Sequence, residues 1–181
     1  MAAAKYGQLQ TFSVQQAIDC AGNGNMGCNG GDTCSLLAWL VDNNIKIALE
    51  KDYPLVLQTQ TCKLSKFDKG VKVASNFSCD RGNENDLLTT LAHHGPVAVA
   101  VNALLWQFYL GGVIKYNCDQ DGINHAVQIV GYDTTATTPH YIVRNSWGTS
   151  FGEKGYLKIA IGDNVCGKYL LFIYHKYSFR L

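Results

Sequence analysis

The sequence predicts an α+β protein in which a helical part precedes a strand-rich part. Two observations predict this class. Up to Pro96, apolar residues recur at the spacing of helices, and from Val97 onward short β-branched and aromatic runs alternate with Gly, Asp and Asn turns. The pattern changes near residues 75–82, which gives two expected domains, 1–78 and 79–181.

The first two helices are marked by the residues that precede them. Ser13-Val14-Gln15-Gln16 has the form of a capping box, with the Ser13 hydroxyl placed to accept from the Gln16 amide, and it predicts a short helix that ends near Cys20. After a turn-rich stretch, either Asp32 or Thr33 can cap a second helix. Its apolar residues recur at helical spacing at Leu36, Leu37, Leu40 and Val41. We expect this second helix to be packed.

A third helix leads into the strands. Asn83 or Asn85 caps it and Gly95-Pro96 ends it. Its apolar positions are Leu87, Leu88, Leu91 and Ala92. The run 97–101 then alternates valine with alanine, as a half-buried strand does, and further strands are expected at 126–132, 141–144 and 156–161. Several short strands favour an antiparallel barrel or sheet packed on one helix.

Charge and hydropathy exclude several classes of protein. With 181 residues, 47% hydrophobic and 16% charged, the chain can bury a core and is not a disordered tail. A net charge of +1 and a pI of about 7.6 favour neither nucleic acid nor an anionic membrane as a partner. No apolar run approaches the roughly 20 residues of a membrane span, and no signal-peptide core follows Met1. If the native protein is secreted or lysosomal, its targeting segment lies outside this sequence.

Cysteine spacing favours disulfides over a zinc site. The chain has 7 cysteines, none of them in a Cys-x-x-Cys pair, and its histidines share no ligand spacing with them. We therefore expect no metal and no cofactor. Asn76-Phe77-Ser78 is a glycosylation sequon at Asn76, which agrees with an oxidising, secretory route.

A histidine and an asparagine are placed to act together. His125 and Asn145 lie about twenty residues apart, each at the end of an expected strand. An amide oxygen that accepts from one imidazole N–H turns the other ring nitrogen toward a thiol, and the Trp147 ring could cover that hydrogen bond. Either residue alone is more often a buried histidine or a turn asparagine. Within these flanking residues, the pair predicts a cysteine-dependent catalytic site.

Five motifs in this order resemble those of papain-family cysteine peptidases. They are Ser13 to Cys20, Gly27-Cys28-Asn29-Gly30-Gly31, Gly111-Gly112-Val113-Ile114, Asn124 to Tyr132 and Asn145 to Gly152. The resemblance implies a papain-like fold with a helical left lobe, here incomplete, and an antiparallel β-barrel right lobe, with the active site between the two lobes. It implies that His125 is the general base, Asn145 its orienter and Trp147 the shield over their contact.

The resemblance also implies how a substrate would bind. Gly30 and Gly31 match a loop whose backbone pairs with an extended peptide, a role that suits residues without side chains. The pocket for the side chain two before the scissile bond would be lined by Asp32, Thr33, Ala100, Ile123, Ala126 and Leu171. Expected partners are a peptide or protein substrate and cystatin-like inhibitors, with no nucleic acid and no membrane. The family suggests a monomer that is lysosomal or extracellular.

The sequence departs from the family in its cysteines. Members carry Gln-x-x-x-x-x-Cys-Gly-x-Cys-Trp, with the histidine about 130 residues downstream, so the nucleophile is expected about five positions before Met1. The family pairs Cys20 with Cys62 and Cys118 with Cys166, and the partner of Cys28 would lie beside the missing nucleophile, which leaves Cys28 unpaired. The two others, Cys34 and Cys79, match no family pair. We expect Cys34 to be a buried thiol.

Two functional hypotheses follow. In the first, the protein is a papain-like peptidase of which this chain lacks the nucleophile and is inactive by itself. In the second, it is a non-catalytic derivative that binds peptides or a protein partner.

Cys34, near a helix N-terminus, is disfavoured as a substitute nucleophile because it lacks an oxyanion donor. Phe151 stands where the family usually has a second tryptophan. Without the family's central helix, we expect poor solubility and a loose helical part around residues 13–75.

Overall fold

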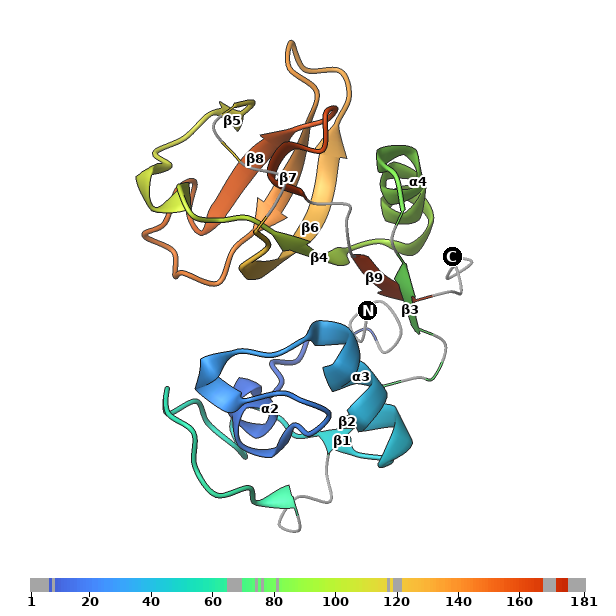
Figure 1. The fold of residues 1–181 in the computed structure, drawn as a ribbon, viewed down its shortest axis with the longest axis vertical. Coiled ribbons are helices and arrows are strands. Elements are labelled where there is room, and N and C mark those ends of the chain that lie inside the picture. Colours follow the sequence, from blue (N-terminus) through green and yellow to red (C-terminus); the bar gives the residue numbers. More distant parts are fainter. Residues whose placement is uncertain are drawn as a thin grey trace. The chain divides into compact units, whose positions relative to one another are not determined.

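The computed structural model describes two compact units (Figure 1). The described residues are 7, 9–64, 70–73, 75, 77–80, 82–116, 118, 122–167 and 172–175. Unit 1 is Met1–Ser75 and unit 2 is Asn76–Leu181, so the sequence-based boundary between 78 and 79 falls three residues later, inside a strand of unit 2. No helix among the described residues has the length and hydropathy needed to cross a membrane.

Unit 1 is built on two helices with side-chain caps. Its described elements are α2 (Val14–Cys20), η1 (Gly27–Asn29), α3 (Thr33–Asp42), β1 (Lys46–Ile47) and β2 (Val71–Lys72), with β1 and β2 antiparallel. The Ser13 hydroxyl accepts from the Gln16 amide at 2.9 Å, as expected for the α2 cap. Of the two residues that could cap α3, the structure uses Asp32, whose carboxylate accepts from the Ser35 amide.

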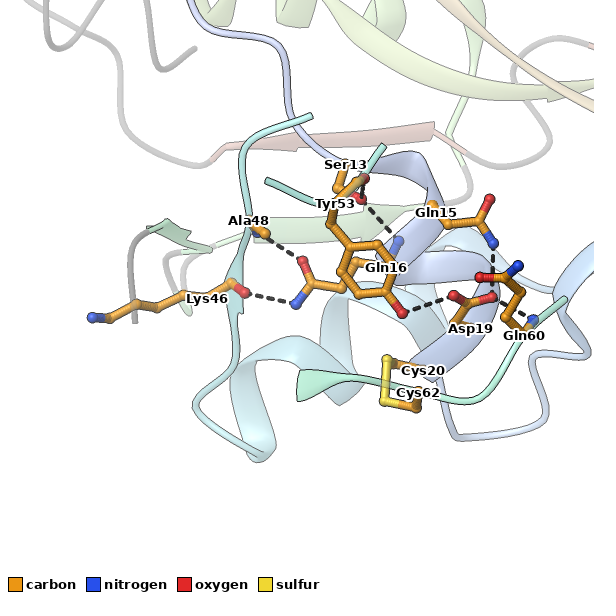
Figure 2. Close-up of a disulfide and its surroundings, with 10 residues drawn as sticks. All are labelled: Ser13, Gln15, Gln16, Asp19, Cys20, Lys46, Ala48, Tyr53, Gln60 and Cys62. Atoms are coloured by element: carbon orange, nitrogen blue, oxygen red, sulfur yellow. Dashed lines mark hydrogen bonds between the residues drawn. A yellow bond between two sulfur atoms is a disulfide. The ribbon is translucent and has the colours of Figure 1, made fainter. Parts of the chain in front are cut away.

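The capping box of α2 is only half formed. The Gln16 side chain does not turn back to Ser13. It donates to the carbonyl of Lys46 in β1 and accepts from the amide of Ala48, which directly follows β1 (Figure 2). Gln15, also buried, accepts from the amide of Val56 and donates to Asp19. Polar side chains of α2 therefore hold the loops that follow α3.

The Asp19 carboxylate is the centre of this network (Figure 2). Three donors lie 2.7 Å from its oxygens, the Tyr53 hydroxyl, the Gln15 side-chain amide and the Gln60 backbone amide. Burial raises the pKa of Asp19, but these hydrogen bonds and the nearby Lys63 outweigh it and hold the pKa below its usual value. Burial, then the bond to Asp19, raises the pKa of Tyr53 to about 12.

Unit 2 is an α+β unit with one seven-stranded sheet. Its described elements are β3 (Phe77–Asp80), α4 (Glu84–His94), β4 (Val97–Val101), η3 (Trp106–Phe108), β5 (Val113–Ile114), β6 (His125–Asp133), β7 (His140–Arg144), β8 (Tyr156–Ala160), η4 (Val165–Gly167) and β9 (Phe172–His175). The strand order is β3-β9-β4-β6-β7-β8-β5. Helix α4 packs against β4, β6 and β9 (Figure 1).

The sheet corrects part of the predicted architecture. The α+β class is confirmed, but the expected antiparallel barrel is not closed within the described residues, because the edge strands β3 and β5 do not pair. The pair of β5 with β8 is parallel, whereas the other described pairs of this sheet are antiparallel. Strand β5 has two residues, too few to show the alternation from which a strand and its direction could be predicted.

The apolar core lies in unit 2. The alternation predicted for β4 is present, with its three valines buried, and Leu87 and Leu91 of α4 pack into the same core as Tyr141 and Ile159. The α4 cap is Asn83, which forms a complete capping box with Asp86. Ala92 is exposed, contrary to its expected place on the apolar face.

Unit 1 buries few apolar side chains. Leu40, Ala48 and Tyr53 are its buried hydrophobic residues within the described part, while Leu36 and Leu37 on α3 are only half buried. The expectation of a packed α3 therefore holds for Leu40 alone. Since apolar burial dominates the stability of folded chains, unit 1 depends on its disulfide and on the Asp19 network more than unit 2 does.

Amide hydrogen exchange is expected to separate the two units. Amides of β4, β6 and β7 should open with free energies roughly 2 to 3 kcal/mol above those of α3, because the α3 face buries so little apolar area. The measurement is native-state exchange followed by mass spectrometry on the 181-residue chain. A single opening free energy shared by both units, with one sharp cooperative melt, would contradict this expectation.

Candidate active site

The ends of two neighbouring strands bring His125 and Asn145 together in unit 2. His125 begins β6, and Asn145 directly follows β7, the antiparallel neighbour of β6. Nε2 of His125 lies 2.8 Å from Oδ1 of Asn145. The backbone amide of Asn145 donates to the carbonyl of Gly155, which holds the start of the following loop. The structure therefore places in hydrogen-bonding contact the two residues that the spacing predicted to meet.

The hydrogen bonds of Asn145 decide the tautomer of His125. Oδ1 of Asn145 also accepts from the backbone N–H of Ser146 at 2.8 Å, so this atom must be the amide oxygen. An oxygen only accepts, so Nε2 of His125 must carry the proton of the neutral ring. Nδ1 is then the unprotonated nitrogen and is available as a base.

Two indole rings lie against the imidazole. The Trp147 ring is tilted by 34° with its centroid 5.2 Å from that of His125, and the Trp106 ring is perpendicular at 6.1 Å. Trp106 is 1% exposed, whereas Trp147 is 41% exposed and Asn145 only 9%. Trp147 has one face toward His125 and remains partly open to solvent. Shielding of this kind strengthens the hydrogen bond between His125 and Asn145 by excluding water.

Phe151 continues the aromatic row. Its ring is perpendicular to that of Trp147 at a centroid distance of 5.1 Å. Because Phe151 replaces the second tryptophan expected from the family, this position packs as an aromatic ring but offers no N–H donor.

The chain before His125 is held by a second asparagine. The side-chain oxygen of Asn124 accepts from the backbone amide of Ala103 at 2.9 Å, and the backbone amide of Asn124 donates to the carbonyl of Val101. Asn102, in the same turn, donates its backbone amide to the carbonyl of Cys166. Asn124 belongs to the motif that runs from Asn124 to Tyr132, but the sequence predicts no role for its side chain, because the partners lie more than twenty residues away.

The cysteines partly follow the pairing that the resemblance implied. Cys20 is bonded to Cys62 and Cys118 to Cys166, and Cys28 is free and exposed. Cys34 and Cys79 are disulfide-bonded, so the expectation that Cys34 is a buried thiol is wrong. The pattern around Cys34 is apolar and helical, and nothing local to it marks a disulfide. Its bonded state also removes Cys34 as a substitute nucleophile.

The residues expected to bind substrate are distributed over both units. In unit 1, Gly30 and Gly31 are exposed, Asp32 caps α3 and Thr33 begins it. Gly30 has a φ of 107° and open space where a Cβ would be, so its backbone is unobstructed. A Cβ on Gly31 would instead meet the side chain of Asn25, which accepts from the amide of Asp32.

In unit 2, Ala100 of β4 and Ala126 of β6 are cross-strand neighbours next to His125. Ala126 is exposed, Ala100 half buried and Ile123 39% exposed. Leu171 and the sequon residue Asn76 lie outside the described residues. In the part of the chain that is described, no three His, Cys, Asp or Glu side chains gather as a metal site would require.

Comparison with known proteins agrees with this geometry. Residues 1–174 match the family described as "Papain family cysteine protease". The chain is 42% identical to human cathepsin O over 161 residues, which cover 88% of this chain and 50% of that protein, and 39% identical to mouse cathepsin K over 167 residues, 90% of this chain and 50% of that one. It therefore spans about half the length of these curated relatives.

Solved structures give the same relationship at the level of the fold. The structure of digestive procathepsin L 3 from the larval midgut of Tenebrio molitor superposes with a TM-score of 0.87 at 34% identity. That superposition covers 97% of this chain and 59% of the other. Digestive procathepsin L2 from the same source gives a TM-score of 0.84 at 32% identity.

Proposed function

We propose that this chain, which belongs to the papain family of cysteine proteases, carries the general base and the orienting amide of a cathepsin O-like peptidase and does not cleave peptides by itself. The observation that carries the proposal is the 2.8 Å contact between Nε2 of His125 and Oδ1 of Asn145, which leaves Nδ1 as the basic nitrogen. Trp147 and the buried Trp106 support it by enclosing the imidazole.

The proposed chemistry needs a thiol that the described site does not contain. Nδ1 of His125 takes the thiol proton, and the resulting thiolate attacks the scissile carbonyl carbon to form a C–S bond. The imidazolium returns this proton to the leaving amine as the C–N bond breaks. In the second half, Nδ1 takes a proton from water, the hydroxide displaces the thiolate from the acyl group, and the proton restores the thiol.

The state of the cysteines supports inactivity of the chain alone. Six of them are disulfide-bonded, and the seventh, Cys28, is exposed in η1 of unit 1, where its backbone amide donates to the Thr59 hydroxyl. A papain-type nucleophile is instead followed by Gly-x-Cys-Trp, and Cys28 is followed by Asn29-Gly30-Gly31. This context does not match that of a nucleophile.

A direct assay tests the proposal of inactivity. The 181-residue chain, incubated under reducing conditions with a dipeptidyl fluorogenic substrate, is expected to give no turnover above buffer. Thiol-dependent turnover that disappears in His125→Ala would contradict it. Turnover that persists in that variant would come from a contaminating peptidase. A mock purification without the chain would then show the same turnover, and a cysteine-protease inactivator would show whether the contaminant is a cysteine protease.

A second candidate function is peptide binding without catalysis. It is favoured by the open backbone at Gly30, which is exposed and could pair with an extended peptide whether or not a thiol is present. Sequencing the 5′ end of the transcript separates the two. A coding segment with Cys-Gly-x-Cys-Trp upstream favours the peptidase, and a verified start without it favours the binding protein.

Location and partners follow from the peptidase proposal. We place the protein in a lysosomal or extracellular compartment, where the oxidising route to disulfides agrees with six bonded cysteines. Its partners would be peptide or protein substrates and cystatin-like inhibitors, and its working state a monomer. Secretion of a tagged full-length protein, or its co-sedimentation with lysosomes, tests the first point.

A further inference from the structure

Tyr109 connects the two segments that carry the indole rings beside His125. It directly follows η3, which begins with Trp106, and its backbone amide donates to the carbonyl of Trp106 at 3.0 Å. Its ring lies 5.9 Å from that of Phe151, which contacts Trp147. The aromatic row therefore runs from Tyr109 through Phe151 and Trp147 to His125.

The hydroxyl of Tyr109 is held by groups on three segments. It lies 2.7 Å from the carbonyl of Gly112 and 3.0 Å from Oε1 of Glu153, and it accepts from the amide of Lys158 at 3.3 Å. Burial, then the bond to Glu153, raises the pKa of Tyr109 to about 12, so the phenol keeps its proton and donates it.

Glu153 is fixed in turn by its own partners. Lys158 pairs with Oε2 at 2.7 Å and holds the pKa of Glu153 below its usual value, while the amide of Gly112 donates to Oε1 at 3.3 Å. The backbone of Glu153 is paired in both directions with Tyr156. The carboxylate is therefore a fixed acceptor at the base of the loop that begins at Asn145.

The loop backbone is shaped around the Tyr109 ring. Gly152 has a φ of 47°, and a Cβ there would come within 2.6 Å of the Tyr156 carbonyl and within 2.8 Å of the Tyr109 ring. The amide of Gly155 donates to the carbonyl of Phe151 at 2.7 Å, which closes the turn. A side chain at residue 152 would clash with both the Tyr156 carbonyl and the Tyr109 ring, so this glycine permits the close contact between Tyr109 and the loop.

We propose that Tyr109 is a positioning residue of the site. Its hydroxyl ties η3 to the Glu153 turn, and this link holds Trp106 and Trp147 against His125 so that water is kept from the bond between His125 and Asn145. The proposal rests on the proposed function only in that it assigns this bond to catalysis. Neither Tyr109 nor Glu153 touches the imidazole in the described contacts.

The test measures the His125 ring itself. In the ¹⁵N-labelled 181-residue chain, exchange of the Nε2 proton of His125 with water is compared among wild type, Tyr109→Phe and Glu153→Gln. Loss of one hydrogen bond corresponds to about a five- to tenfold change in an opening equilibrium, and Tyr109→Phe is expected to exchange this proton faster by about that factor. Glu153→Gln keeps an acceptor for the Tyr109 hydroxyl but removes its charge and the pair with Lys158, so a smaller increase in the same direction is expected. Tyr132→Phe, a change of the same kind at a half-exposed tyrosine of β6, is the matched control and should not alter it.

The outcomes separate this proposal from the function it refines. If the wild-type ring shows no Nε2 proton bonded to Asn145, the proposed function fails and the positioning role fails with it. If that proton is present and exchanges equally in all variants, the positioning role alone is wrong. Amide shifts of α4 and β4 report whether a variant remains folded, and if Tyr109→Phe unfolds, Glu153→Gln, which keeps every aromatic ring, decides the matter.

Discussion

If the proposed peptidase joins this chain to a segment that carries the nucleophile, replacing His125 with alanine in that protein is expected to lower kcat/KM for peptide hydrolysis by about 10⁴-fold or more. The His125 imidazole is the only group in the described site placed both to accept a thiol proton at Nδ1 and to be oriented at Nε2 by Asn145. Without it the thiol stays largely protonated and the leaving amine receives no proton. The measurement is steady-state hydrolysis of a dipeptidyl fluorogenic substrate.

Two further variants, Asn145→Ala and His93→Ala, are expected to lower kcat/KM less than His125→Ala does. Asn145→Ala keeps the base but frees its orientation, and a misplacement of about 1 Å costs about 100-fold. His93→Ala is the matched control, because His93 is exposed on α4 and bonds only to the carbonyl of Thr89 in the described contacts. Equal activity of His125→Ala and His93→Ala would show that His125 is not the base.

Asp19→Asn is expected to destabilise unit 1 by about 2 to 4 kcal/mol. In one orientation the new NH₂ group would face the Tyr53 hydroxyl. In the flipped orientation it would face the Gln15 side chain and the Gln60 backbone amide, so in either case at least one donor loses its acceptor. Bonds to a charged acceptor are worth more than neutral ones, and unit 1 has little apolar burial to compensate. Hydrogen exchange of α2 and α3 amides measures the change.

The pH dependence follows from the direction of the Asp19 shift. Its pKa is lower in the folded state than its ordinary value, so the stabilisation is fully present above the unfolded pKa of about 3.9 and is lost as the pH falls through the folded value. Unit 1 should therefore keep this contribution at pH 5 and lose it in stronger acid. Asp52→Asn, at an exposed turn position, is the control. If the stability of unit 1 depends on pH in the same way in Asp19→Asn and Asp52→Asn, Asp19 is not the cause of the loss of stability in acid.

The parts of the fold that could be predicted from the sequence are those with local causes. The caps Ser13, Asp32 and Asn83 act within three residues of themselves, so their sequence signatures are sufficient. The alternation of β4 is likewise local. The meeting of His125 with Asn145 could be predicted because each residue stands at the end of a recognisable strand.

The remaining features depend on partners distant in the chain. The Gln16 side chain donates to Lys46 of β1, thirty residues later in the chain, and Glu153 contacts Tyr109 across 44 residues. The parallel pair of β5 with β8 and the bonded state of Cys34 have no local signature either. A sequence pattern records which residues are polar or apolar, but the distant acceptor of a given donor is decided only when the chain is packed.

The tautomer of the His125 ring decides whether Nδ1 is free to act as the base. Long-range ¹H–¹⁵N correlation on the 181-residue chain distinguishes protonated from unprotonated ring nitrogens, and it requires neither substrate nor thiol. We predict a neutral ring with the proton on Nε2 and a bare Nδ1, and loss of this preference in Asn145→Ala. A ring protonated on Nδ1, or a tautomer unchanged by Asn145→Ala, would contradict the assignment of His125 and Asn145 as base and orienter.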